Sequence, residues 1–291
     1  MLLRDKVFEF SGPRPIYCCK MTNDGQLRVG ALRGALVADS LALAPHWIYD
    51  PNEIQQRFGQ VDGLLEPAEG GYHSGQPKGG QTHLGYQTIV LFEALRDRAD
   101  FAERLREFWA DSLSYQDHAT KTFLAGGSDR SDEMAGASRL AAVIAAAPVG
   151  QAREAMREQV LVTHDESVVK AGLQLVSLAE RLESGRGVRE AVEEEFAGSE
   201  VLKQAIAVEG KEPAEALGAL GRDCSLTSAL PAVIYLLRRS KGYRETLVEN
   251  VMAGGDSASR GLILGALLAL SEGESAIPAQ WSVDLQYQIN G

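Results

Sequence analysis

Cysteine is scarce in this chain of 291 residues. Two of the three cysteines, Cys18 and Cys19, are adjacent, and Cys224 stands alone. Neither a Cys-x-x-Cys pair nor a cysteine–histidine cluster at zinc-finger spacing occurs, so the sequence predicts no disulfide framework and no structural zinc site of that kind. We therefore expect a reducing compartment, the cytoplasm.

Long apolar runs are also missing. The longest, residues 261–270, is too short to cross a bilayer, and the N-terminal segment has no apolar core of signal-peptide length. We expect no membrane partner. A chain of this length can bury a large core and fits one sizeable domain or two small ones.

Basic residues are too few for nucleic-acid binding. The chain has 29 Lys and Arg against 40 Asp and Glu, a net charge of −11, which repels a polyanion. The phosphate-binding patterns of P-loop and dinucleotide-binding proteins are absent as well. Small anionic ligands remain compatible, because helix N-termini and glycine-loop amides attract phosphate locally.

Alternating strand patterns are nearly absent, whereas helical periodicity is strong. Apolar residues recur at steps of three and four along residues 168–182, behind the turn at 163–166. The same pattern occurs over residues 27–43, 89–95, 134–147, 226–237 and 258–270. The sequence therefore predicts a compact all-α domain of many helices.

A glycine turn precedes the last of these helices. Gly254 and Gly255 lead into Asp256, which is expected at the helix mouth, where backbone N–H groups are unpaired. Asp256 could cap the helix, adjoin a docked phosphate, or hold a cation together with the hydroxyl of Ser259. The small residues of this helix and of residues 31–38 predict that the two helices pack closely.

Asp39 lies in the helix expected over residues 27–43, near its C-terminal end. It is either satisfied by a neighbouring helix end or part of a pocket, because burying an acid on an apolar helix is expensive without a partner. The glycine-rich segment 69–85, which holds His73 and His83, is either a surface connection or a lid over the pocket. A lone histidine is more often structural than catalytic, so the histidines predict no nucleophile or base.

Several motifs in this order resemble those of ADP-ribosylglycohydrolases, a family that includes dinitrogenase-reductase-activating glycohydrolases and crystallin-like relatives. Residues 38–42 (Ala-Asp-Ser-Leu-Ala) match the family's Gly-Asp-Ala-Leu-Gly, and residues 85–88 (Gly-Tyr-Gln-Thr) stand where the family has Thr-Asp-Asp-Thr. The late motif Gly-Gly-Asp-x-Asp-Thr/Ser retains its glycines, Asp256 and Ser259, but its second acid is Ala258.

The resemblance favours a single domain over residues 21–291, preceded by an N-terminal extension, residues 1–20, that lies outside it. It also implies a nucleotide pocket and a metal site. The family uses two Mg²⁺ ions, but with Tyr86, Gln87 and Ala258 in place of acids we expect one weakly bound ion or none. Its remaining ligands would be Asp256, Ser259 and Thr88. The residues expected to bind the ligand are Asp39, His46, Gly126, Gly127, Ser128 and Gly136.

Three functions are compatible with these features. The first is hydrolysis, with reduced activity, of the glycosidic bond of ADP-ribosylated proteins or small ADP-ribose conjugates. The second is a non-catalytic ADP-ribose-binding or crystallin-like structural protein that has lost the binuclear metal centre. The third is hydrolysis of another glycoside by a metal-free pair of carboxyl groups, one with a pKa raised by burial. The sequence does not choose between an enzyme and a binding protein.

Overall fold

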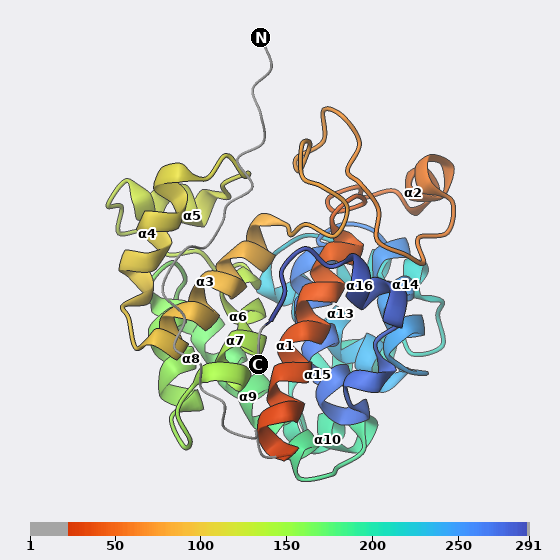
Figure 1. Cartoon of the computed structure of the whole chain (residues 1–291). Coiled ribbons are helices and arrows are strands. Elements are labelled where there is room, and N and C mark those ends of the chain that lie inside the picture. Colours follow the sequence, from red (N-terminus) through yellow and green to blue (C-terminus); the bar gives the residue numbers. More distant parts are fainter. Residues whose placement is uncertain (1–22, 290–291) are drawn as a thin grey trace.

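The computed structural model describes residues 23–289. The predicted N-terminal extension, residues 1–20, lies outside the described residues. The described part is a bundle of helices wrapped around a central pair (Figure 1). The helices are α1 (Asn23–Ala42), α2 (Pro51–Phe58), α3 (His83–Asp97), α4 (Phe101–Asp111), α5 (His118–Leu124), α6 (Ala135–Ser138), α7 (Leu140–Ala146), α8 (Ala152–Leu161), α9 (Glu166–Glu183), α10 (Val188–Glu195), α11 (Glu200–Ala207), α12 (Pro213–Leu220), α13 (Leu226–Arg238), α14 (Tyr243–Met252), α15 (Ser257–Glu272), the 3₁₀-helix η1 (Glu274–Ala276) and α16 (Ala279–Asp284).

No β-strand forms between residues 23 and 289, where the two β-type contacts are isolated bridges, Ser131 with His164 and Glu133 with Ser225. The prediction of an all-α fold is confirmed. The abundance of alanine explains it, because alanine has the highest helix propensity and leaves little branched surface for a sheet to pack.

The central pair consists of α1 and α15, which run antiparallel. A Cβ atom built on Gly34 would lie 2.5 Å from the carbonyl oxygen of Gly265, and one built on Gly265 would lie 2.4 Å from the carbonyl oxygen of Gly34. Glycine at both positions therefore allows the two backbones to touch, as the small-residue pattern predicts. The antiparallel arrangement brings the C-terminal half of α1 beside the N-terminus of α15, so Asp39 and Asp256 lie at the same end of the bundle.

A long connection without regular structure, residues 59–82, joins α2 to α3 at that end (Figure 1). Its last part is held by the segment after α16. The backbone N–H of Gln286 donates to the carbonyl of Gly79, and a Cβ on Gly79 would lie 1.8 Å from the carbonyl oxygen of Asp284. Lys78 also forms an ion pair with Asp284 at 2.8 Å. In the part of the chain that the structure describes, no helix is both long and apolar enough to cross a membrane.

Candidate active site

The glycine turn before α15 is clamped from two sides. Gly255 has a φ of 73°, its carbonyl accepts the backbone N–H of Trp47 at 3.0 Å, and its own N–H donates to Ile48 at 2.8 Å. A Cβ on Gly255 would lie 2.1 Å from the carbonyl oxygen of Arg222, so any larger residue would push the two segments apart. The turn thereby fixes Asp256 at the start of α15.

Asp256 is buried and interacts with side chains on its own helix. Its Oδ2 accepts the hydroxyl of Ser259, and its carboxyl group makes no capping hydrogen bond to the helix backbone. Burial raises the pKa of Asp256 to about 6, although the Ser259 hydroxyl and the charge of Arg260 favour the ionised form. Arg260 is also fully buried and donates to Asn250 and to the carbonyl of Gly254. Asp256 is therefore a buried carboxyl group that titrates near neutral pH.

Asp39, on α1, is the second buried carboxyl group. Its Oδ2 accepts the backbone N–H of Thr82 at 2.7 Å and its Oδ1 accepts the Thr82 hydroxyl at 2.6 Å. Burial raises the pKa of Asp39 to about 7, and the negative charge of Asp256 adds to the increase, while the Thr82 hydrogen bonds oppose it. The charge of Asp256 thus reaches Asp39, and both carboxyl groups lie at the end of the bundle where α1 meets the start of α15.

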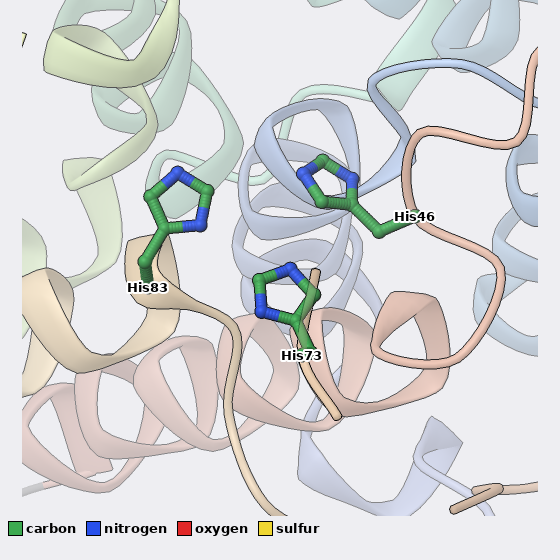
Figure 2. Close-up of side chains that lie close together, drawn as sticks. All are labelled: His46, His73 and His83. Carbon is green, nitrogen blue, oxygen red and sulfur yellow. The ribbon is translucent and has the colours of Figure 1, made fainter. Parts of the chain in front are cut away.

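Three of the five histidines converge on the same site, as Figure 2 shows. His46 follows α1, His73 lies in the connection between α2 and α3, and His83 begins α3. Their ring centroids are 5.5 Å apart for His46 and His73, 5.6 Å for His73 and His83, and 6.0 Å for His46 and His83. Burial lowers the pKa of His73 to about 3 and that of His83 to about 4, and it lowers the pKa of His46 as well. All three imidazoles are therefore neutral at pH 7.

Aromatic side chains surround these histidines. Trp47 stacks on His46 with ring centroids 4.4 Å apart and meets Tyr72 and Tyr115 edge-on at 4.8 and 5.2 Å. Tyr72 is exposed and Trp47 is half-buried, so this group reaches the surface. Trp47 has a φ of 65°, an uncommon conformation for a large side chain that persists because the Gly255 contacts hold it.

A hydrogen-bonded network extends from the histidines beneath α3. Asp117 Oδ2 lies 3.5 Å from His83 Nε2 and accepts the amide of Gln87 at 3.2 Å. The Gln87 side-chain carbonyl in turn accepts Arg139 Nη1 at 2.8 Å. Asp117 and Arg139 are both buried, and Gln87 joins these opposite charges.

The comparisons with known proteins identify this arrangement of helices and motifs. Residues 23–290 match the family profile described as ADP-ribosylglycohydrolase. The chain belongs to the ADP-ribosylglycohydrolase family. A solved structure described as "ADP-ribosylglycohydrolase-related protein complex" has a similar fold, with a TM-score of 0.72 and 20% sequence identity over 90% of this chain and 92% of that chain. No curated protein matches the sequence significantly.

The residues expected to line the family's nucleotide pocket lie in three places. Asp39 and His46 lie in the site just described. Gly126, Gly127 and Ser128 are exposed in the loop after α5. Gly136 is buried in α6, where a Cβ would lie 2.6 Å from the ring of His164, so this glycine permits close packing against that histidine.

The positions that correspond to the family's metal-binding acids carry few free oxygen atoms. The hydroxyl of Tyr86 donates to Gln76 Oε1 at 2.7 Å, and the side chain of Gln87 joins Asp117 to Arg139. The hydroxyl of Thr88 donates to the carbonyl of Leu84 at 3.0 Å, within its own helix. The two hydroxyls donate their hydrogens in these bonds and keep their oxygen lone pairs, whereas Gln87 uses both ends of its amide.

Asp256, Ser259 and Thr88 thus keep oxygen atoms for an ion, together with Asp39, whose two oxygens are held by Thr82. The other groups in the site are imidazoles, which Mg²⁺ does not prefer, because this ion needs near-octahedral oxygen coordination and carboxylates to balance its charge. These residues do not fit a pair of magnesium ions.

Two features of the site were missed by the sequence interpretation. His73 and His83 join His46, although the three are separated by 27 and 10 positions in the sequence, a spacing that belongs to no metal-binding motif. Asp117, which backs His83, was not expected in the site either. The available signal was the density of histidine and aromatic residues between positions 46 and 86.

Proposed function

We propose that this ADP-ribosylglycohydrolase family member slowly hydrolyses the glycosidic bond of ADP-ribose conjugates, linked to proteins or to small molecules, without the family's pair of Mg²⁺ ions. The observation that carries the proposal is the pairing of Asp39 and Asp256. Both carboxyl groups are buried and have raised pKa values, and the charge of Asp256 contributes to the raised pKa of Asp39. Glycoside hydrolysis by two carboxyl groups requires one that holds a proton and one that is ionised, and the higher pKa of Asp39 suits it to the first role.

The surroundings of the two groups assign them different roles. Asp256 receives the Ser259 hydroxyl and lies near the charge of Arg260, so it is the better carboxylate and acts as the base that takes a proton from water. Asp39 has the higher pKa, about 7, so at pH 7 about half of the molecules hold a proton on it and it acts as the acid. The water oxygen bonds to the anomeric carbon while the glycosidic bond breaks, and the leaving group takes the proton from the acid.

The aromatic group formed by Trp47, Tyr72 and Tyr115 supports an ADP-ribose ligand. Tryptophan and tyrosine rings present flat apolar faces on which an adenine base stacks, and this group reaches the surface beside the buried acids. A nucleoside diphosphate sugar would lie with its base on these rings and its distal ribose toward the carboxyl groups.

A non-catalytic ADP-ribose-binding protein is the second candidate. The observation in its favour is that Asp39 is 0% exposed and Asp256 is 1% exposed, so a ribose reaches the acids only if surrounding residues move. A protein that binds ADP-ribose on its aromatic surface and does not open further would have no turnover.

The test is release of ADP-ribose from ADP-ribosylated protein and from a small ADP-ribosyl conjugate, measured with and without added Mg²⁺. We expect slow release that does not depend on Mg²⁺, and a fall of at least about 100-fold in Asp256→Asn, since general base catalysis contributes roughly 10²- to 10⁴-fold. Asp111→Asn, at an exposed position, is the matched control.

Calorimetric titration with ADP-ribose separates the two candidates. Binding of ADP-ribose without release from either conjugate would establish the binding protein. Release that depends strongly on added Mg²⁺ would overturn the proposal that hydrolysis proceeds without the pair of Mg²⁺ ions. Absence of both binding and release would contradict both candidates.

A further inference from the structure

Three buried nitrogen atoms in the candidate site have no hydrogen-bond partner in the part of the chain that the structure describes. They are His46 Nε2, His73 Nε2 and His83 Nδ1. The three residues are only 4%, 5% and 1% exposed, and an unpaired buried polar atom is costly. All three therefore require an explanation.

The unpaired nitrogens face one another. One ligand atom from each histidine lies within 4.8 Å of the other two, and in Figure 2 the three rings surround a common space. The histidines come from three separate segments: the turn after α1, the connection between α2 and α3, and the first residue of α3. Their convergence is a property of the fold and not of one local motif.

We infer that His46, His73 and His83 form a binding site for one divalent first-row transition-metal ion, for which Zn²⁺ is the appropriate probe. Neutral imidazole nitrogens suit zinc, copper and nickel, whereas Mg²⁺ prefers oxygen. Three protein ligands leave the fourth position of a tetrahedral zinc ion open to water or substrate. The site thus differs in donor chemistry from the binuclear magnesium centre to which the family's acids belong.

The spacing of the nitrogens requires a small contraction. Zinc–nitrogen bonds of about 2.0–2.1 Å place the ligand atoms of a tetrahedron about 3.3 Å apart, against separations of up to 4.8 Å here. His73 can supply this movement, because it lies in the connection between α2 and α3, which has no regular secondary structure. His46 and His83 are held more firmly by their contacts with α15 and α5.

Two carboxylates supply the negative charge that such an ion needs. Asp117 Oδ2 lies 3.5 Å from His83 Nε2, the ring atom opposite the unpaired Nδ1, and so orients this ligand in the way that carboxylates behind metal-binding histidines do. Asp256 Oδ1 lies 3.8 Å from His46 Nε2. Asp256 is therefore close enough to accept a hydrogen bond from water at the fourth position.

His46 is the weakest of the three ligands. The backbone N–H of Ala258 donates to His46 Nδ1 at 3.3 Å, so the neutral ring carries its proton on Nε2 when no metal is bound. Metal binding through Nε2 moves this proton to Nδ1 and breaks that long hydrogen bond. Loss of His46 should accordingly reduce the affinity for the metal ion less than loss of His73 or His83.

The experiment uses untagged full-length protein that has been treated with a chelator and then dialysed. Zn²⁺ and Mg²⁺ are each titrated by calorimetry, and Co²⁺ is added separately to record the visible absorption of a tetrahedral nitrogen site. The variants are His46→Ala, His73→Ala, His83→Ala and Asp117→Asn. His118→Ala, at an exposed position, is the matched control for removal of a histidine.

We expect the unaltered protein and His118→Ala to bind one Zn²⁺ per chain and no comparable amount of Mg²⁺. With Co²⁺, both should show the visible absorption of a tetrahedral nitrogen site. His73→Ala and His83→Ala should reduce the affinity for Zn²⁺ by more than about 100-fold. Asp117→Asn should reduce it by roughly 10- to 100-fold, the usual effect of losing the carboxylate that holds a metal-binding histidine in place. Circular dichroism identifies unfolded variants. For any that unfolds, His→Gln at the same position replaces it.

Three outcomes would overturn the inference: no Zn²⁺ binding by the unaltered protein, unchanged affinity in folded His73 and His83 variants, or equal loss in His118→Ala. None of these measurements uses ADP-ribose. A failure of the metal site is therefore distinguishable from a failure of the hydrolase proposal.

Discussion

The carboxylate of Asp39 accepts both the backbone N–H and the hydroxyl of Thr82, which caps α3. The same Thr82 oxygen accepts the N–H groups of Leu84 and Gly85. One threonine thus connects α1 to the first turn of α3 and fixes the residue that follows it, His83. The arrangement of the site depends on this connection.

Thr82→Val tests it, because the substitution keeps the shape of the side chain and removes the hydroxyl. We expect the free energy of unfolding to fall by about 1–3 kcal/mol, since a helix cap and a hydrogen bond to a buried carboxylate are lost together. Urea denaturation followed by circular dichroism measures the change. Thr227→Val, at an exposed position, should change it by less than about 0.5 kcal/mol.

Gly34→Ala tests the close contact of α1 with α15. The added methyl group would lie 2.5 Å from Ala269 Cβ and from the carbonyl oxygen of Gly265, so the helices must separate, and overpacking of this kind costs about 1–3 kcal/mol. Gly30→Ala is the control in the same helix, because its methyl would approach the flexible Glu274 side chain at 3.3 Å. A melting temperature that is lower for Gly30→Ala than for Gly34→Ala would contradict this account of the helix contact.

Acidification should destabilise the protein through its buried histidines. Burial lowers the pKa of His73 to about 3 and that of His83 to about 4, against about 6.5 in the unfolded chain. As the pH falls below 6.5, the unfolded state binds these protons first, so stability is lost between pH 6.5 and the folded-state pKa values. Asp39 and Asp256 act in the opposite direction between about pH 4 and 7, because their folded-state pKa values are raised.

The contribution of one histidine can be isolated by comparing slopes. Between pH 6 and pH 4, the slope of the unfolding free energy against pH should be smaller in His73→Gln than in the unaltered protein. The decrease should be up to about 1.4 kcal/mol per pH unit, the value for one proton. Urea titrations at half-unit pH intervals measure it, with His118→Gln as the control for loss of a histidine. An unchanged slope in His73→Gln would mean that His73 titrates alike in both states.

Gln87→Glu puts an acid back at a position where the family carries one. The new carboxylate would replace the amide that donates to Asp117 at 3.2 Å and would repel it, while Arg139 offsets part of the added charge. We expect a loss of about 1–3 kcal/mol at pH 7. Added Mg²⁺ should not restore stability, which thermal unfolding with and without the ion would check. Recovery with Mg²⁺ would show that a single acid rebuilds a magnesium site.

The sequence predicts the helical fold and the α1–α15 contact well, because both depend on local propensity and on small residues at helical spacing. It also points to Asp39 and Asp256, which sit on helices whose ends a sequence pattern can locate. The weak or absent binding of Mg²⁺ stays a prediction.

The histidine cluster could not be predicted in the same way. His73 reaches the site through a connection without periodicity, and its position depends on how residues 59–82 fold back onto the bundle. The roles of Thr88 and Gly136 likewise depend on partners chosen by tertiary packing, the Leu84 carbonyl and the His164 ring.

The anchoring of Gly79 beneath residues 284–286 has a consequence for biosynthesis. The connection that carries His73 is held in place by hydrogen bonds and an ion pair to a segment about 200 positions later in the chain. During translation the ribosome must release that late segment before the connection can be fastened. The histidine cluster is therefore completed only after synthesis has passed residue 286, later than α15, which completes the central pair of helices.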